Sequence, residues 1–544
     1  MKIGIAQINT TTGDFEGNCG KILEFAGRLK SMGADMALFP ELALCGPLPK
    51  DRAASARFLE ENERRLGLLA RELPIPAAVG FVRRSGGAIG AFNSLAWLEG
   101  GKARAFYDKH LLPNYGIFEE PRNFDAGSGV CVVEFMGRRI GLSICEDIWA
   151  LDEETAARYA ACERPVDLLA GEGLDVLLNA SASLWSPENE TARRALLPKV
   201  ARAVNAPFVY CNLVGGNDEM VCGGGGCALS ADGSYCRIMP KFEEAAAVVD
   251  IGAMAPCAVP EFDRIAEMYG ALKMSLRDFV SKSGFKKVAL GLSGGIDSAF
   301  VAALAADALG PENVVGVSMP SRFSSDHSVS DAEALARNLG MEMKSVPIAG
   351  IVEAAEGALS EIFAGLPRDV AEENLQSRSR GLVLMAISNK LGAMVLATGN
   401  KSECAVGYCT LYGDTCGGFA PISDVYKTDV YRLSRYVNRS REIIPENSIT
   451  KPPSAELRPG QKDSDSLPEY DVLDAVLYAY IEGKKTAAEI AAMGYAPEVV
   501  RDALGRFERN EYKRRQLPPG PRVSVASFGV GRRMALSDKM GGGL

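Results

Sequence analysis

Hydrophobic and polar residues in the first half of the chain form short strand-like runs separated by amphipathic helical stretches. The strand-like runs cover residues 2–9, 36–40, 77–82, 94–98, 131–135, 140–144, 176–179 and 208–212. Helical spacing of apolar residues covers 21–30 and 57–71. This order predicts a strand-rich, layered α/β domain that ends near Asp250.

The same alternation begins again in the second half. Gly252, Pro256 and Pro260 precede it and indicate a linker. Strand-like runs at 288–292, 314–319 and 394–398 then alternate with helical patterns at 297–309 and 328–339. Repeated β-α-β spacing predicts a second, mostly parallel sheet. We therefore predict two α/β domains, residues 1–255 and 262–544.

Two segments fall outside these patterns. The glycine run from Gly223 to Gly226 predicts a loop. Residues 516–534 are rich in Pro and Gly but keep apolar side chains, so we expect an ordered strap there and not a tail.

The composition excludes several classes of protein. Of 544 residues, 47% are hydrophobic and 24% are charged, as in ordinary globular proteins. The net charge of −9 argues against a basic face for nucleic acid or an anionic membrane. We see no signal-peptide pattern and no membrane-length apolar run, so we expect a cytoplasmic protein with small-molecule ligands. The two His residues are too few for most zinc sites or a His-based catalytic pair.

The strongest chemical signal is the string ALGLSGGIDS, residues 289–298, in which a strand runs through a glycine turn into a helix. Glycines let the backbone approach an anion, and the N–H groups at the helix start favour phosphate. The string lacks the Gly-Lys-Ser/Thr of a Walker A loop and the spacing of GxGxxG. The candidate phosphate-binding residues here are Gly291, Ser293, Gly294, Gly295, Asp297 and Ser298.

SGGIDS resembles the pyrophosphatase loop of the ATP-pyrophosphatase superfamily, whose members split ATP into AMP and pyrophosphate. Four later strings, ENLQSR (373–378), ATGNKSE (397–403), GDTCGG (413–418) and PSAELRP (453–459), resemble signature segments of NAD synthetases in that superfamily. The resemblance implies a Rossmann-like parallel α/β sheet of the ATP-pyrophosphatase type. It also implies that Thr398 contacts ATP, that Asp297 and Glu403 hold Mg²⁺, and that Asn374, Glu403 and Lys513 bind deamido-NAD.

Three strings in the first half each follow a strand pattern: FPE ending at Glu41, YDKH containing Lys109, and ICEDIW containing Cys145. A thiol can attack a carboxamide if one group takes its proton and another stabilises the oxyanion. A carboxylate and an ammonium supply those roles without His. We predict that Glu41, Lys109 and Cys145 form one catalytic site at the ends of different strands.

This trio resembles the Glu-Lys-Cys triad of the nitrilase superfamily, and the resemblance runs from Met1 to about Asp250. It implies an α-β-β-α sandwich. It also implies that Tyr115, Ser181 and Arg193 bind glutamine.

The two halves together resemble the family in which a nitrilase-like glutaminase is fused to an NAD synthetase. That resemblance implies ATP-dependent amidation of deamido-NAD to NAD, the last step of NAD synthesis, with ammonia from glutamine passing through an internal channel. The reaction would proceed through an adenylate and release AMP, pyrophosphate and glutamate. It further implies a homo-oligomer that pairs through the synthetase domains. Three alternatives stay open: an ammonia-only synthetase with a structural amidase-like domain, a nucleotide sensor, and another amidotransferase that makes GMP or asparagine.

Overall fold

The computed structural model describes residues 1–537 and divides the chain into two compact units, Met1–Phe262 and a second that starts at Asp263. Residues 538–544 of the predicted second domain lie outside the described residues. Within the described part of the chain, no helix is both long and apolar enough to cross a membrane.

The first unit is built on two mixed sheets that face each other. The strands of one sheet, in spatial order, are β14 (Ala245–Asp250), β1 (Lys2–Gln7), β2 (Met36–Leu38), β3 (Ala77–Arg84), β4 (Ala91–Glu99) and β5 (Lys102–Asp108). Those of the other are β13 (Tyr235–Ile238), β12 (Cys227–Leu229), β9 (Phe208–Asn212), β8 (Val176–Ser181), β7 (Arg138–Ile144) and β6 (Cys131–Phe135). The apolar residues between the sheets form one core that includes Ile5, Trp97 and Leu142.

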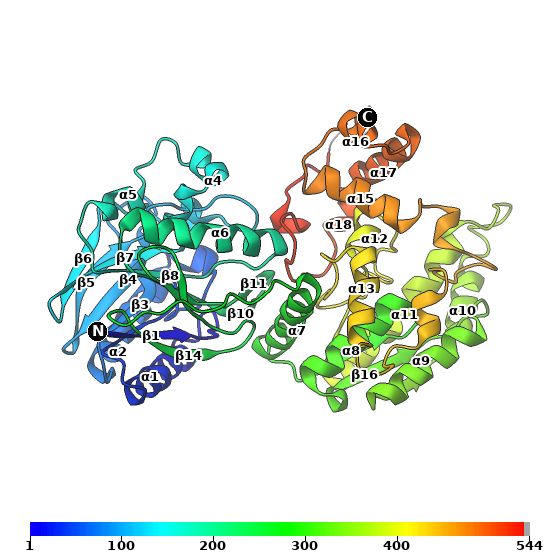
Figure 1. Cartoon of the computed structure of the whole chain (residues 1–544). Coiled ribbons are helices and arrows are strands. Elements are labelled where there is room, and N and C mark those ends of the chain that lie inside the picture. The colour runs from blue at the N-terminus through cyan, green and yellow to red at the C-terminus, as the bar shows by residue number, and fades with distance from the viewer. Residues whose placement is uncertain (538–544) are drawn as a thin grey trace. The chain divides into compact units, whose positions relative to one another are not determined.

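Helices cover the outer faces of these sheets. Figure 1 shows α1 (Phe15–Ser31) and α2 (Ala56–Glu72) on one side, and α5 (Pro165–Ala170) and α6 (Pro187–Val204) on the other. Separate apolar clusters lie under each pair of helices. The predicted α-β-β-α sandwich is therefore confirmed. Shorter elements complete the unit: α3 (Glu120–Asn123), α4 (Glu153–Arg158), and the hairpin β10 (Val214–Asn217) and β11 (Met220–Gly223).

The second unit contains a parallel sheet in the order β17 (Glu342–Ser345), β16 (Val314–Ser318), β15 (Lys287–Gly291) and β18 (Ala393–Val395). The helices associated with the sheet are α7 (Arg264–Lys282), α8 (Ile296–Leu309), α9 (Asp326–Leu339), α10 (Ala349–Leu359), α11 (Val370–Leu391), α12 (Lys401–Val406), α13 (Lys427–Val437) and α14 (Glu446–Thr450). A second helical group comprises α15 (Tyr470–Ile481), α16 (Ala487–Ala492), α17 (Pro497–Arg509) and α18 (Glu511–Arg514). The predicted Rossmann-like parallel fold is confirmed.

Several predicted boundaries were wrong for identifiable reasons. α1 begins six residues before the predicted start at Lys21, because the Asp14 side chain caps its N-terminus by accepting from the Gly17 N–H. The last predicted strand, 394–398, ends at Val395, and Leu396 makes only an isolated bridge to Phe419. Gly223, predicted to lie in a loop, pairs with Val214 in the β10–β11 hairpin.

The segment 516–534 packs as an ordered strap, as predicted. The N–H groups of Val523 and Ser524 both donate to Asp424, at 2.8 Å, and Val523 is buried. The strap therefore belongs to the packed body of the second unit.

Candidate active sites

The structure brings Glu41, Lys109 and Cys145 together in the first unit. Lys109 follows β5 directly, Cys145 follows β7 directly, and Glu41 lies three residues beyond β2. All three side chains are buried, and the charges of Glu41 and Lys109 both act on the Cys145 thiol. The ends of three strands thus supply three different chemical groups to one place.

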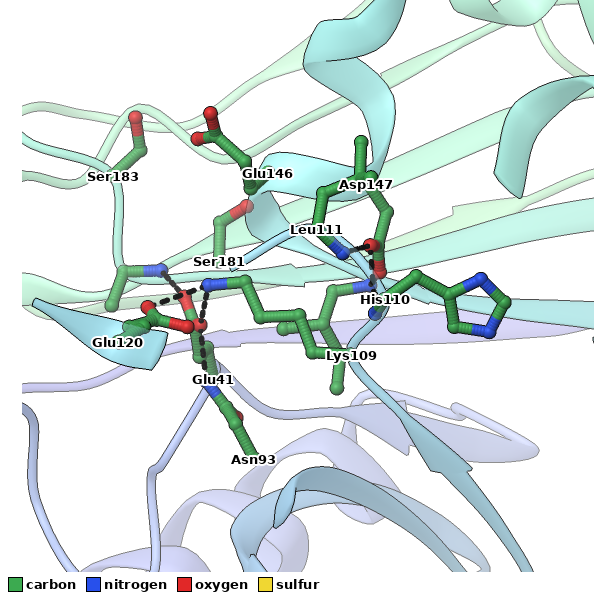
Figure 2. A network of polar contacts seen from close by, with 12 residues as sticks. Glu41, Asn93, Lys109, His110, Leu111, Glu120, Glu146, Asp147, Ser181 and Ser183 are labelled. Carbon is green, nitrogen blue, oxygen red and sulfur yellow. Dashed lines mark hydrogen bonds and ion pairs between the residues drawn. The ribbon is translucent and has the colours of Figure 1, made fainter. Parts of the chain in front are cut away.

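Lys109 is shared between two carboxylates (Figure 2). Its Nζ donates to Glu41 Oε1 and to Glu120 Oε1, at 2.7 Å each. Glu41 also accepts from Asn93 Nδ2 at 2.7 Å and from the Ala182 N–H at 2.8 Å. These bonds fix the orientation of the Glu41 carboxylate beside the thiol.

Burial and charge set the protonation states in this site. Burial raises the pKa of the Cys145 thiol well above its ordinary value, and the charge of Glu41 raises it further, whereas Lys109 lowers it. Burial alone would lower the pKa of Lys109, but the Glu120 and Glu41 charges hold it well above its usual range. A protonated thiol beside a carboxylate needs that carboxylate as a base before it can act as a nucleophile.

The backbone at the nucleophile is strained. Cys145 has φ +39°, in the left-handed region that non-glycine residues avoid. The buried Asp147 carboxylate holds this turn, because it accepts from the N–H groups of Ile144, His110 and Leu111, at 2.9 to 3.1 Å. Figure 2 shows Asp147 beside His110 and Leu111, so one carboxylate ties the Cys145 turn to the segment after Lys109.

The three candidate glutamine-binding residues have separate surroundings. The Tyr115 hydroxyl donates to Glu146, and the Arg158 guanidinium lies 4.2 Å from the centre of the Tyr115 ring. Ser181 ends β8, and its hydroxyl donates to Asn179 Oδ1 at 2.7 Å. The buried Arg193 guanidinium pairs with Glu190 one turn away on α6, and its Nη1 has no hydrogen-bond partner among the described residues.

The second candidate site is a cavity of about 460 Å³ in the second unit. It is lined by Gly291, Ser293, Gly295, Asp297, Ser298, Asn374, Thr398, Glu403 and Lys513, all of them predicted from the sequence. Gly294 is the one predicted residue that does not line this cavity. Its φ is +74°, and a Cβ at this position would lie 2.4 Å from the Ser328 carbonyl oxygen, so only glycine fits against α9.

The SGGIDS turn presents the start of α8 to this cavity. The Ser293 and Ser298 hydroxyl oxygens lie 3.1 Å apart, and the Gly295 N–H donates to Ser293 Oγ at 3.2 Å. In the part of the chain that the structure describes, no side chain caps the N-terminus of α8, a helix of 14 residues. Its first N–H groups and its dipole therefore remain available to a phosphate.

Asp297 and Glu403 converge on the buried ammonium of Lys427, which pairs with Asp297 and lies 3.3 Å from Glu403. Asn400 also donates to Asp297, at 2.9 Å. Burial raises the pKa of Glu403 to about 8, against the charge of Lys427. No cluster of three or more His, Cys, Asp or Glu side chains in residues 1–537 could hold a metal alone. Two carboxylates nevertheless fit Mg²⁺, which usually takes its other ligands from water and substrate phosphates.

The candidate deamido-NAD residues line the same cavity. Asn374 accepts from the Thr410 hydroxyl at 2.8 Å. Lys513 donates to the carbonyl oxygens of Gly407 and Cys409, at 2.7 and 2.8 Å, just beyond α12. Residues more than 100 positions apart are thus joined around one opening.

Comparisons with known proteins cover both units. The carbon-nitrogen hydrolase family model matches residues 2–255, and the NAD synthase model matches 268–518. The glutamine-dependent NAD(+) synthetase of Synechocystis sp. is 42% identical over 98% of each chain, and that of Thermotoga maritima 41% over 99% of each. The chain belongs to the glutamine-dependent NAD(+) synthetase family. A solved structure of the enzyme from Acinetobacter baumannii, in complex with ADP, is 38% identical, with a TM-score of 0.77 and 98% of each chain covered.

Three charged residues at the two sites of this glutamine-dependent NAD(+) synthetase family member escaped the sequence analysis. Lys427 is buried on the face of α13 that also holds Val430 and Leu433, so a lysine in an apolar helical register was a signal that could have been used. Glu120 lies on a four-residue helix without periodicity, and no pattern marks it. Glu146 stood inside a quoted string, but only its neighbour Cys145 was assigned a role.

Proposed function

We propose that this family member makes NAD by amidating deamido-NAD with ammonia from glutamine, and that each site residue acts as the sequence predicted. ATP is the co-substrate, and AMP, pyrophosphate and glutamate are the other products. The observation that carries the proposal is the Lys109 ammonium, held at 2.7 Å from two carboxylates beside a buried cysteine, in a chain that also has a phosphate-binding turn. Relatives that match over both halves support glutamine as the nitrogen source and disfavour the three alternatives.

The glutaminase reaction would run in two stages. Glu41 accepts the Cys145 proton while the sulfur attacks the carboxamide carbon, and Lys109 stabilises the resulting oxyanion. The carbon–nitrogen bond then breaks, the nitrogen takes the proton from Glu41 and leaves as ammonia, and a thioester remains. Water attacks the thioester with Glu41 again as base, which releases glutamate and restores the thiol. Tyr115, Ser181 and Arg193 would hold the glutamine during both stages.

The synthetase reaction needs activation of a carboxylate, because a carboxylate does not lose oxide to an amine. The start of α8 and its glycine turn would bind the ATP phosphates, together with Thr398. Asp297 and Glu403 would hold Mg²⁺, which neutralises phosphate charge when bound. Asn374, Glu403 and Lys513 would position deamido-NAD, so that its carboxylate forms the adenylate and ammonia then displaces AMP.

Labelled glutamine tests the proposal directly. The full-length protein is incubated with ATP, Mg²⁺, deamido-NAD and glutamine that carries ¹⁵N in its amide, and products are followed by mass spectrometry. We expect ¹⁵N-labelled NAD, AMP, pyrophosphate and glutamate. Cys145→Ala should abolish synthesis from glutamine but not from added ammonium, whereas Cys162→Ala, at an exposed cysteine, should change neither. If glutamate forms without NAD, deamido-NAD is not the acceptor. If the native protein makes NAD from ammonium but not from glutamine, the first unit has only a structural role.

We further propose that the protein is a cytoplasmic homo-oligomer that pairs through its synthetase units. Support for pairing comes from α11, on which Leu382 and Met385 lie one turn apart and are both exposed. These two residues form an exposed apolar strip on one face of the helix, and such surfaces are typical of a protein–protein contact.

A further inference from the structure

Asp147 has no part in the proposed mechanism, although its carboxylate is fully buried two residues beyond the nucleophile. It accepts a hydrogen bond from the Tyr107 hydroxyl at 2.9 Å, in addition to those from the N–H groups of Ile144, His110 and Leu111. Since an ionised carboxylate can accept about four hydrogen bonds, these four donors use nearly all of its capacity. The side chain is therefore built to hold the chain around it and not to bind a ligand.

Three of the four donors enclose Lys109 in the sequence. Tyr107 lies two residues before it on β5, and His110 and Leu111 are the next two residues after it. Figure 2 shows Asp147 beside the last two, next to the Lys109 side chain. The segment that carries the ammonium is thus held by Asp147 on both sides of Lys109.

The fourth donor lies directly before the nucleophile. Asp147 is the third residue of the helical turn Cys145–Leu151, and it reaches back to the N–H of Ile144 at 3.1 Å, as in a capping box. The left-handed backbone of Cys145 is costly, and such a conformation persists only where its surroundings fix it. The same carboxylate therefore also fixes the backbone that carries the thiol.

The reaction needs these two segments at one defined separation. The sulfur attacks the carboxamide carbon while the ammonium faces the oxygen bonded to that carbon, so both groups must fit one small group of atoms. Lys109 follows β5 and Cys145 follows β7, and these strands belong to different sheets. An error of about 1 Å in such an arrangement can cost about 100-fold in rate.

We propose that Asp147 is a positioning residue of the glutaminase: it sets the distance between the Cys145 thiol and the Lys109 ammonium, so that both act on the same carboxamide. This proposal rests on the proposed glutaminase function. The base Glu41 is held by other groups, the Asn93 amide and the Ala182 N–H. Loss of Asp147 should therefore impair stabilisation of the oxyanion more than removal of the thiol proton.

The first test is Asp147→Asn in the full-length protein. The amide has the shape of the carboxylate, but its NH₂ group meets N–H donors where an acceptor is needed. For ammonia release from glutamine, kcat should fall about 100-fold while KM changes by less than about threefold. Synthesis from added ammonium should stay native. The matched control is Asp125→Asn, whose carboxylate also accepts from two backbone N–H groups, those of Ile89 and Gly90, and which should keep the native kcat and KM.

The second test uses a reaction of the thiol that forms no oxyanion. Iodoacetamide alkylates Cys145 when a sulfur–carbon bond forms, iodide leaves and the thiol proton passes to Glu41, so Lys109 has no role in this step. The alkylation rate of Cys145, followed by mass spectrometry of its peptide, should change by less than about threefold in Asp147→Asn. If alkylation and glutamine hydrolysis fall by the same factor, Asp147 acts on the thiol or on the fold alone, and the proposal is wrong.

The remaining outcomes separate this inference from the function on which it rests. If the native protein releases no ammonia from glutamine, the proposed function fails. If thermal unfolding shows that Asp147→Asn does not fold, Tyr107→Phe removes one of the four donors and should lower kcat about fivefold at unchanged KM, the usual size of one hydrogen bond. Native kcat in Tyr107→Phe, or a loss in Asp147→Asn that appears mainly in KM, would overturn the positioning role.

Discussion

The Lys109 ammonium is buried away from water. Its charge is stabilised there because it forms ion pairs with two carboxylates. Besides Lys109, two groups hold Glu41, the Asn93 amide and the Ala182 N–H, and Glu41 stays available as a base. One oxygen of Glu120 accepts from Lys109, and its second oxygen has no hydrogen-bond partner within residues 1–537. At the scale of single residues, Glu120 is therefore the less well satisfied of the two carboxylates.

Substituting Glu120 should change how stability depends on pH. Burial raises the pKa of Glu120 from 4.5 to about 8, although Lys109 lowers it. Between those values the folded protein keeps a proton that the unfolded chain has lost, so stability falls as the pH rises from about 4.5 to about 8. The Glu120→Gln variant has no carboxyl group at this position, so its stability lacks this pH dependence. Between pH 5 and pH 9, we expect the free energy of unfolding of the native protein, taken relative to that of the variant, to drop by a few kcal/mol. This is on the order of what such a pKa shift implies.

Thermal unfolding of both proteins across that pH range measures the difference. Glu60→Gln, at an exposed carboxylate on α2, is the control, and its stability should depend on pH in the same way as that of the native protein. A native-minus-variant difference that stays constant with pH, or that grows as the pH rises, would contradict the raised pKa.

At the scale of elements, the six-residue helix α12 connects the synthetase site to the C-terminal strap. Its cap residue Asn400 bonds Asp297. On the other side, the fully buried Lys401 ammonium pairs with Asp424 at 2.8 Å and Glu482 at 2.6 Å, and donates to Ser524 Oγ at 2.7 Å. One short helix and its cap residue are thus bonded to four other parts of the chain, at residues 297, 424, 482 and 524.

Lys401→Met should strongly destabilise the synthetase unit. The substitution keeps most of the length of the side chain but leaves Asp424 and Glu482 buried without their cation, which costs about 3–5 kcal/mol when one partner of a buried pair is removed. Urea unfolding followed by circular dichroism measures the loss. Lys390→Met, at an exposed position on α11, controls for the removal of a lysine, and equal midpoints for the two variants would refute the role of this network.

Elements with a long or regular pattern could be predicted from the sequence, and short ones could not. The strands at 131–135 and 208–212 were predicted to the residue, because each coincides with an apolar run; 208–212 is buried along its length, whereas 131–135 lies at the edge of its sheet. Glu41, Lys109 and Cys145 could be grouped because each ends such a run. The helices α3 and α12 are too short for any periodicity, so the contacts of Glu120 and Lys401 follow from tertiary packing alone.

At the scale of the whole molecule, the exposed apolar strip of α11 predicts self-association. Leu382 is 63% exposed on a helix that is otherwise part of a packed α/β unit. The double variant Leu382→Glu, Met385→Glu should place like charges in the contact and lower the molar mass measured by light scattering by at least half. Met136→Glu, at an exposed methionine of the first unit, should leave the mass unchanged. An unchanged mass in the α11 variant would exclude this helix from the interface.

The two reactions of the molecule also make a joint prediction about nitrogen. Ammonia released at Cys145 is mostly protonated if it reaches neutral water, and the ammonium ion has no lone pair with which to displace AMP. A direct internal passage to the synthetase site would avoid this loss. With ¹⁵N-amide glutamine and a tenfold excess of unlabelled ammonium, we therefore expect NAD that carries mainly ¹⁵N. Cys145→Ala under the same conditions should make only unlabelled NAD, which proves that the external pool is usable. An isotope ratio in NAD equal to that of the mixed pool would mean that ammonia equilibrates with solvent between the two reactions.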